Sequence, residues 1–182
     1  KIGQRYFSHG KYPERGRNIF AIYFNGLHKW CQYYKNRISD CFLLEIKMSI
    51  FSGKCLCGSV TYECHVEPKA IYNCHCEDCR RATGSVFGTN LFVPEDQVKI
   101  SGKVSTYSHQ ADSGSTMVKQ FCAKCGSLLF GNNSARANIV SIRAGTVDQL
   151  DVIKPQINLF MESKVPSTSI DTNLKQSARM PS

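Results

Sequence analysis

Cysteine spacing constrains this 182-residue chain more than any other feature, because seven of its ten cysteines fall into three short motifs. The motifs are C-x-C-G at Cys55–Gly58, C-x-C-x-x-C at Cys74–Cys79 and C-x-x-C-G at Cys122–Gly126. Cysteines one or two residues apart bridge each other poorly but converge readily on one metal ion. The spacing therefore favours bound metal in a reducing, cytoplasmic compartment over the disulfide framework of a secreted domain.

The first and third motifs together supply four thiolates, which is the ligand set of a closed, structural zinc site. The predicted ligands are Cys55, Cys57, Cys122 and Cys125. A glycine follows the last thiolate of each motif, and glycine allows the positive φ that a backbone needs to curl around a metal. Such a site would clamp the start of the domain to a late hairpin. The alternative interpretation is four buried cysteines without metal.

The middle motif supplies three thiolates, Cys74, Cys76 and Cys79, called the cysteine trio below. A zinc ion with three protein ligands keeps one position open for water or substrate, which is the arrangement of a catalytic site. Two alternatives stay open: Cys64 closes the site as a fourth ligand, or the trio binds nothing. Together the motifs predict two zinc ions per chain.

Three residues beside the trio are further candidates. His75 lies between two predicted ligands, and alternation along an extended segment would turn its ring away from the metal. We therefore expect it to support the ligands rather than join them. Arg80 and Arg81 directly follow Cys79 and are candidate substrate-binding residues, because they would hold a carboxylate or offset the charge of thiolate-bound zinc. The alternative is a solvated helix face.

Outside the motifs the sequence predicts short β-strands, one short helix and a single, mainly β domain. The expected strands are rich in β-branched and aromatic residues. They cover Ser59–Cys64, Val86–Val93, Val104–Ser108, Thr116–Phe121, Ile139–Arg143 and Pro155–Glu162. The helix is expected over Glu77–Thr83, with Gly84 as its C-cap, and Gly102 and Gly114 mark turns. No apolar run is long enough for a membrane span.

The net charge of +9 first suggests an acidic partner, but its distribution argues otherwise. Residues 1–47 carry nine Lys and Arg against three Asp and Glu, whereas residues 48–182 carry fourteen against eleven. Seven thiolates and two zinc ions would bring residues 48–182 to neutrality, so nucleic-acid binding loses its main support. We expect residues 1–47 to lie outside the domain as non-native or poorly ordered sequence, and residues 48–182 to form it.

The motifs resemble those of the glutathione-dependent formaldehyde-activating family, whose domain also occurs in centromere protein V. The resemblance rests on G-K-C-L-C-G-S-V-T-Y-E at Gly53–Glu63, N-C-H-C-E-D-C-R-R-A-T-G-S at Asn73–Ser85 and F-C-A-K-C-G-S-L-L at Phe121–Leu129. A late stretch, P-Q-x-x-x-F-x-x-S-K-x-P at Pro155–Pro166, and Met180-Pro181 are also similar. The similarity runs from about Met48 to the C-terminus, and residues 1–47 match nothing in the family.

The resemblance implies a β-tent fold, in which small antiparallel sheets and a short helix are braced by a structural zinc. It assigns the four cysteines of the outer motifs to that zinc and the trio to a catalytic zinc. It further implies a carbon–sulfur lyase that joins a small-molecule thiol such as glutathione to a small aldehyde, giving S-hydroxymethylglutathione from formaldehyde. One departure is Ser167, which stands where many relatives carry tryptophan, so a pocket wall differs.

Two other functions compete with this interpretation. A zinc-braced scaffold without turnover, as the centromere relative suggests, would bind a protein partner. The second alternative is a redox enzyme, because methionine sulfoxide reductase B resembles this fold. That enzyme adds a separate nucleophilic cysteine to its zinc site. Only Cys64 could take this role here. The sequence fixes neither the substrates, nor the general acid, nor the oligomeric state.

Overall fold

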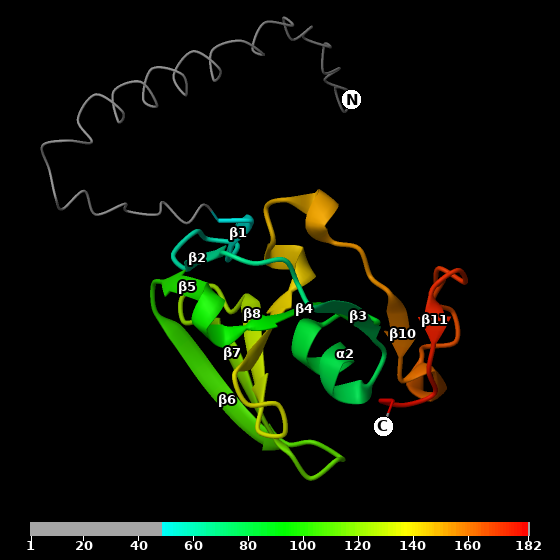
Figure 1. Cartoon of the computed structure of the whole chain (residues 1–182). Helices are drawn as coiled ribbons and strands as arrows, with labels where there is room; N and C mark the ends of the chain where they lie inside the picture. The colour runs from blue at the N-terminus through cyan, green and yellow to red at the C-terminus, as the bar shows by residue number, and fades with distance from the viewer. Residues whose placement is uncertain (1–48, 182) are drawn as a thin grey trace, which may run out of the picture. The chain divides into compact units, whose positions relative to one another are not determined.

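The computed structural model describes residues 49–181, which form two β-sheets and one α-helix (Figure 1). The small sheet has the order β1-β2-β5 and the large sheet the order β11-β10-β3-β4-β9-β8-β7-β6. The small-sheet strands are β1 (Phe51–Lys54), β2 (Thr61–Cys64) and β5 (Val98–Ser101). The large-sheet strands are β3 (Ala70–Cys74), β4 (Gly88–Pro94), β6 (Val104–Gln110), β7 (Thr116–Cys122), β8 (Leu128–Asn133), β9 (Ile139–Arg143), β10 (Ile157–Leu159) and β11 (Lys175–Gln176).

Helix α2 (Glu77–Thr83) lies between β3 and β4 in the sequence. Short 3₁₀ turns cover Glu95–Gln97, Ala144–Thr146, Leu150–Val152 and Met161–Ser163. No helix of the described part of the chain is long and apolar enough to cross a membrane. The prediction about residues 1–47 lies outside the described residues.

The mainly β class and most of the predicted elements are confirmed. Strand β9 and helix α2 begin and end as predicted, and Gly84 caps the helix with a φ of 64°. The last predicted strand is shorter than expected, because Phe160 takes a left-handed φ of 58° and ends β10 at Leu159. The sheets are antiparallel except at β10, which runs parallel to β3 and β11.

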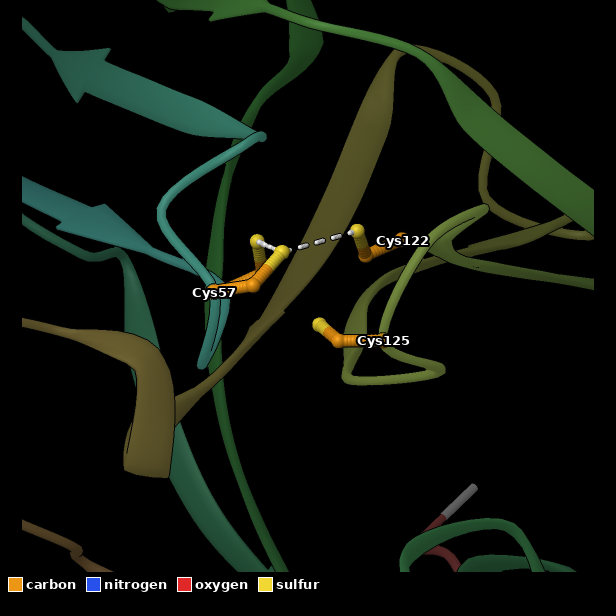
Figure 2. A group of neighbouring side chains, drawn as sticks. Cys57, Cys122 and Cys125 are labelled. Atoms are coloured by element: carbon orange, nitrogen blue, oxygen red, sulfur yellow. Dashed lines mark hydrogen bonds between the residues drawn. The ribbon is translucent and has the colours of Figure 1, made fainter.

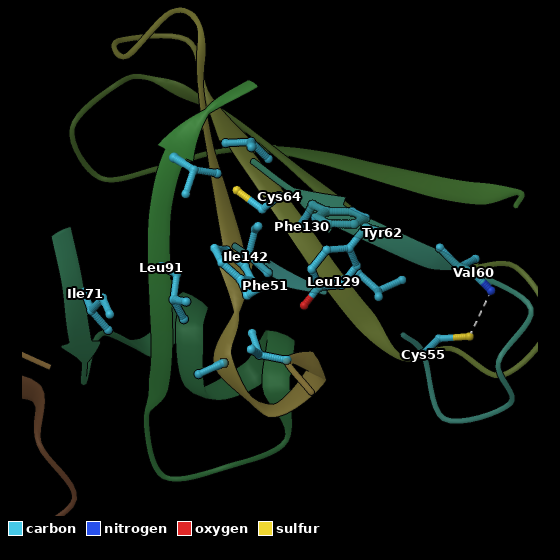
Figure 3. Close-up of a cluster of buried hydrophobic side chains, with 14 of the residues drawn as sticks. Phe51, Cys55, Val60, Tyr62, Cys64, Ile71, Leu91, Leu129, Phe130 and Ile142 are labelled. Carbon is cyan, nitrogen blue, oxygen red and sulfur yellow. Dashed lines mark hydrogen bonds between the residues drawn. The ribbon is translucent and has the colours of Figure 1, made fainter. Parts of the chain in front are cut away.

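One face of the large sheet is apolar and forms the core with the small sheet. Ile71, Leu91, Ile142 and Phe130 stand opposite one another across four neighbouring strands, so their side chains share one face. None is more than 3% exposed. The edge of the Tyr62 ring meets Phe130, with centroids 5.2 Å apart and planes at 74°, which joins the two sheets (Figure 3).

The other face of the large sheet is polar and carries α2. Asn90 pairs with Arg143 in register, and Gly131 pairs with both Ser141 and Lys119, so these side chains share the second face. Helix α2 contacts it at Gly88: a Cβ atom added there would lie 3.6 Å from the Cβ of Cys79.

Helix α2 also approaches an edge strand, since Oδ2 of Asp78 lies 3.8 Å from Nδ1 of His109 in β6. Three strands separate β4 from β6 in the sheet. The helix and its side chains therefore extend across the polar face from β4 to β6.

We expect Gly53→Ala to destabilise the junction between the sheets. A Cβ atom at Gly53 would collide with the backbone carbonyl oxygen of Thr146 and with the Tyr62 ring, and a carbonyl cannot rotate away. Overpacking of this kind costs about 1–3 kcal/mol. The control is Gly145→Ala, because no heavy atom lies within 4 Å of that added Cβ.

Urea unfolding monitored by circular dichroism measures both variants. A Gly53→Ala protein as stable as the Gly145→Ala protein would contradict the packing described here.

Candidate metal centres

The two outer cysteine motifs meet at one end of the molecule and form the four-cysteine group, Cys55, Cys57, Cys122 and Cys125. Cys55 directly follows β1, and Cys122 is the last residue of β7. All four Sγ atoms lie within 4.8 Å of one another. The structure therefore brings together the four residues predicted from the sequence (Figure 2).

The sulfur spacing in this group fits a tetrahedral ion. The Sγ atoms of Cys55 and Cys57 are 3.6 Å apart, and those of Cys57 and Cys122 are 3.8 Å apart. Zinc–sulfur bonds of about 2.3 Å in a tetrahedron place sulfurs about 3.8 Å from each other. Four converging donors of this kind are suited to a closed site without an open coordination position.

Each motif ends in a tight turn closed by its glycine, over four residues in the first motif and over five in the third. The amide of Gly58 donates to the carbonyl of Cys55 at 3.0 Å, and the amide of Gly126 donates to that of Cys122 at 2.9 Å. Their φ values are 73° and 74°, the left-handed region that favours glycine. No heavy atom lies within 4 Å of a Cβ added at either position, so conformation and not space selects glycine.

Two serines that sequence reasoning missed support the sulfurs. The hydroxyl of Ser59 lies 3.1 Å from Cys57 Sγ, and that of Ser127 lies 3.2 Å from Cys125 Sγ. The Ser127 hydroxyl lowers the pKa of Cys125 to about 5, and Ser59 lowers the pKa of Cys57. Thiolates are the metal-binding form of cysteine. The signal was present in the sequence, because both motifs continue as C-G-S.

The cysteine trio straddles the junction between β3 and α2. Cys74 ends the strand, Cys76 is the N-cap of the helix and Cys79 lies in its first turn. The Cys79 amide donates to Cys76 Sγ at 3.4 Å, and the Sγ atoms of Cys74 and Cys76 are also 3.4 Å apart. All three sulfurs lie within 4.8 Å of one another, so the predicted convergence is present.

Charge within the trio favours a bound cation. Hydrogen bonds from the Cys74 and Cys76 thiols hold the pKa of Cys79 far below its usual range, and Arg143 and Lys119 lower it further. The pKa of Cys74 is raised above the usual thiol range by its hydrogen bonds to Cys76 and Cys79 and by burial. One thiolate is thus stable in the trio, and three require a positive ion among them.

His75 and Cys64 do not join the trio. The His75 ring is fully buried and packs against Phe87, with centroids 5.0 Å apart, as expected for a residue that supports its neighbours. Burial lowers the pKa of His75. Cys64 is fully buried in β2, and its thiol donates to the carbonyl of Val66 at 3.4 Å. It neither closes the trio nor offers the exposed nucleophile that the redox interpretation needs.

The two candidate arginines have different surroundings. Arg81 points to solvent and forms an ion pair with Glu77 one helical turn earlier, with Nη2 2.6 Å from Oε1. Its side chain is 77% exposed, so the solvated-face interpretation fits it. Arg80 is half-buried, and its Nε has no hydrogen-bond partner among residues 49–181. Of the two, Arg80 is the better placed to meet a ligand.

A surface hollow of about 270 Å³ lies on the small sheet, and its walls include Lys54, Glu63, Lys99 and Asp148. None of the seven cysteines of the two groups lines it.

Comparison with known families identifies the domain. The family described as "Glutathione-dependent formaldehyde-activating enzyme" matches residues 50–163, which is more than half of the chain. The chain belongs to this family. The matched segment contains all seven cysteines of the two groups. Members of the family are generally enzymes of the lyase type.

Other comparisons are sparser. A search of curated proteins finds no match to this chain. Among solved structures, a crystal structure of a Rhodobacter sphaeroides protein is 19% identical, with a TM-score of 0.44. That alignment covers 57% of this chain and 96% of the other.

We expect the metal content to fall from two ions to one when Cys122 is replaced by serine. Loss of one ligand from the four-cysteine group should also destabilise the domain by about 3 kcal/mol or more, because binding a structural ion contributes directly to folding. The control is Cys64→Ala, which removes a buried cysteine outside both groups and should keep two ions.

Plasma emission spectrometry and urea unfolding measure the two effects. The assignment would be wrong if Cys122→Ser retained both ions, or if Cys64→Ala lost one.

Proposed function

We propose that this protein is a zinc-dependent carbon–sulfur lyase that joins a thiol such as glutathione to a small aldehyde such as formaldehyde. One observation carries the proposal: the trio offers three converging sulfurs, one fewer than a tetrahedron needs. The family supports it, since its description names glutathione and formaldehyde. The four-cysteine group would hold a structural zinc, and the trio would hold a catalytic one.

The ion supplies Lewis acidity at the trio when bound, which lowers the pKa of a thiol that occupies the fourth position. The protein supplies the geometry. The β3–α2 junction fixes Cys74 and Cys76, and burial of Cys79 against Gly88 holds the first turn of the helix on the sheet. Cys76 is the most exposed of the three, so the side of the site next to it is open to substrate.

The reaction itself is an addition. The thiol gives its proton to solvent, and the S–H bond breaks. The sulfur attacks the carbonyl carbon, a carbon–sulfur bond forms, and the C=O π electrons pass to oxygen, which then takes a proton. We assign that proton to solvent, because His75 is fully enclosed and burial favours its neutral form. Holding both reactants beside the trio converts an encounter of two small molecules into a reaction within one site.

Free thiols are required for this chemistry, so the proposed protein works in a reducing compartment such as the cytoplasm. The eight cysteines of the described residues form no disulfide in the structure, which agrees with such a setting.

Cys76→Ser should abolish adduct formation while the domain stays folded. Serine removes the most exposed ligand of the trio, and the four-cysteine group on another part of the sheet is unaffected. The rate of S-hydroxymethylglutathione formation, followed by NMR with ¹³C-formaldehyde and glutathione, should fall to that of the uncatalysed reaction. Metal content should fall from two ions to one. The control is Ser85→Ala, an exposed position just after the same helix.

If the Cys76→Ser protein kept wild-type turnover, the proposal that the trio is the catalytic site would be wrong. A folded wild-type protein with two ions and no acceleration of adduct formation would instead support a zinc-braced scaffold.

A further inference from the structure

The polar face under α2 contains two buried cations, and neither has an acidic partner among residues 49–181. Arg143 in β9 is 6% exposed, and Lys119 in β7 is 5% exposed. Neither side chain forms a hydrogen bond or an ion pair with any of residues 49–181. Nε of Arg143 and Oδ1 of Asn90, its cross-strand neighbour, are buried with unused hydrogen-bonding capacity.

The Arg143 guanidinium packs across two glycines beside the trio. A Cβ atom added at Gly88 would lie 3.9 Å from Nη1 of Arg143 and 3.6 Å from Cβ of Cys79. A Cβ added at Gly131 would lie 3.4 Å from Nη2. The guanidinium therefore lies over Gly88 and Gly131, beside Cys79. Lys119 pairs in register with Gly131, so its side chain leaves the sheet on the same face.

Arg143 lies beside the trio, because its Nη1 atom and the Cβ atom of Cys79 are both within 4 Å of a Cβ added at Gly88. The positive charges of Arg143 and Lys119 both act on Cys79. Three thiolates and one zinc ion would carry a net charge of −1, and Arg143 with Lys119 adds two positive charges. Before an anionic substrate binds, one positive charge is left over in this buried region. Leaving a charge unpaired in a protein interior is unfavourable, and a buried guanidinium without a partner is suited to a planar anion.

We propose that Arg143 and Lys119, with Asn90 beside them, bind a carboxylate of the thiol substrate next to the cysteine trio. The guanidinium would donate two parallel hydrogen bonds to the carboxylate, and the Lys119 ammonium would supply the second charge. This site adds to the substrate-binding role that the sequence predicts for Arg80 and Arg81. It deepens the proposed lyase by selecting anionic thiols, and rests on that function only for the identity of the thiol.

Substrate comparison tests the site in the wild-type protein with zinc bound. Glutathione and its diethyl ester carry the same thiol but differ in carboxylate charge. We expect kcat/KM to be about ten- to hundredfold higher for glutathione than for the ester, as charge-assisted hydrogen bonds predict. Equal values for the two thiols, with turnover present, would overturn the anion site and leave the lyase standing.

Substitutions of the two cations test whether they cause the preference for glutathione over its ester. Arg143→Met and Lys119→Met should each raise KM for glutathione about tenfold or more beyond any change in KM for the diethyl ester, so that the preference for glutathione falls. The matched control is Lys103→Met, which removes the same charge from an exposed position. Loss of zinc or of folding stability without a change in the preference for glutathione would show that the cations only balance the thiolates, which overturns the proposal.

A binding measurement separates this inference from the lyase. S-methylglutathione cannot react, but keeps both carboxylates. Calorimetry should show that it binds the wild-type protein about tenfold or more tightly than Arg143→Met or Lys119→Met, and that free acetate competes only at far higher concentration. This difference would support the anion site even if no thiol were turned over. Identical binding to wild type and both variants would overturn it. If Arg143→Met fails to fold, Lys119→Met and the ester comparison decide.

Discussion

The site depends on the convergence of three sulfurs at the junction between β3 and α2. An extended strand carries Cys74 to the edge of the helix, the N-cap position turns Cys76 inward, and the first turn brings Cys79 back to within 4.8 Å of both. The negative charges that three thiolates would carry repel one another in a buried position, so this arrangement is stable only with cations close by. A bound metal ion, Arg143 and Lys119 would each offset this negative charge.

The large sheet separates folding from chemistry by using its two faces differently. Leu91, Ile142 and their neighbours fill one face and pack on the small sheet, as Figure 3 shows. The next residues in the same two strands, Asn90 and Arg143, lie on the opposite face, under α2. Alternation in a strand places these two environments on opposite sides of a single layer. A shift of one residue in register would exchange them, so the buried apolar face also fixes the position of the cations.

Much of this architecture could be predicted from local sequence signals, and the rest could not for a physical reason. Motif spacing identified the residues of both cysteine groups, because ligands close in sequence converge by local geometry. Helix α2 and strand β9 were predicted because capping glycine and β-branched residues act locally. Strands β1, β3, β5, β8 and β11 were missed. In β3 and β8 the polar Asn73 and the late polar residues Asn132 and Asn133 hide the alternation. Arg143 and Lys119 lie 24 residues apart on β9 and β7. They share one face only through sheet register, which no local pattern encodes.

Anomalous diffraction at the zinc absorption edge, from crystals of the full chain grown with zinc, tests the central claim most directly. The account predicts two anomalous peaks per chain. One lies among the four sulfurs of Cys55, Cys57, Cys122 and Cys125, and the other is bonded to the sulfurs of Cys74, Cys76 and Cys79 with a solvent or substrate atom as its fourth neighbour. A single peak at the four-cysteine group, or a second ion whose fourth ligand is another protein atom, would contradict it.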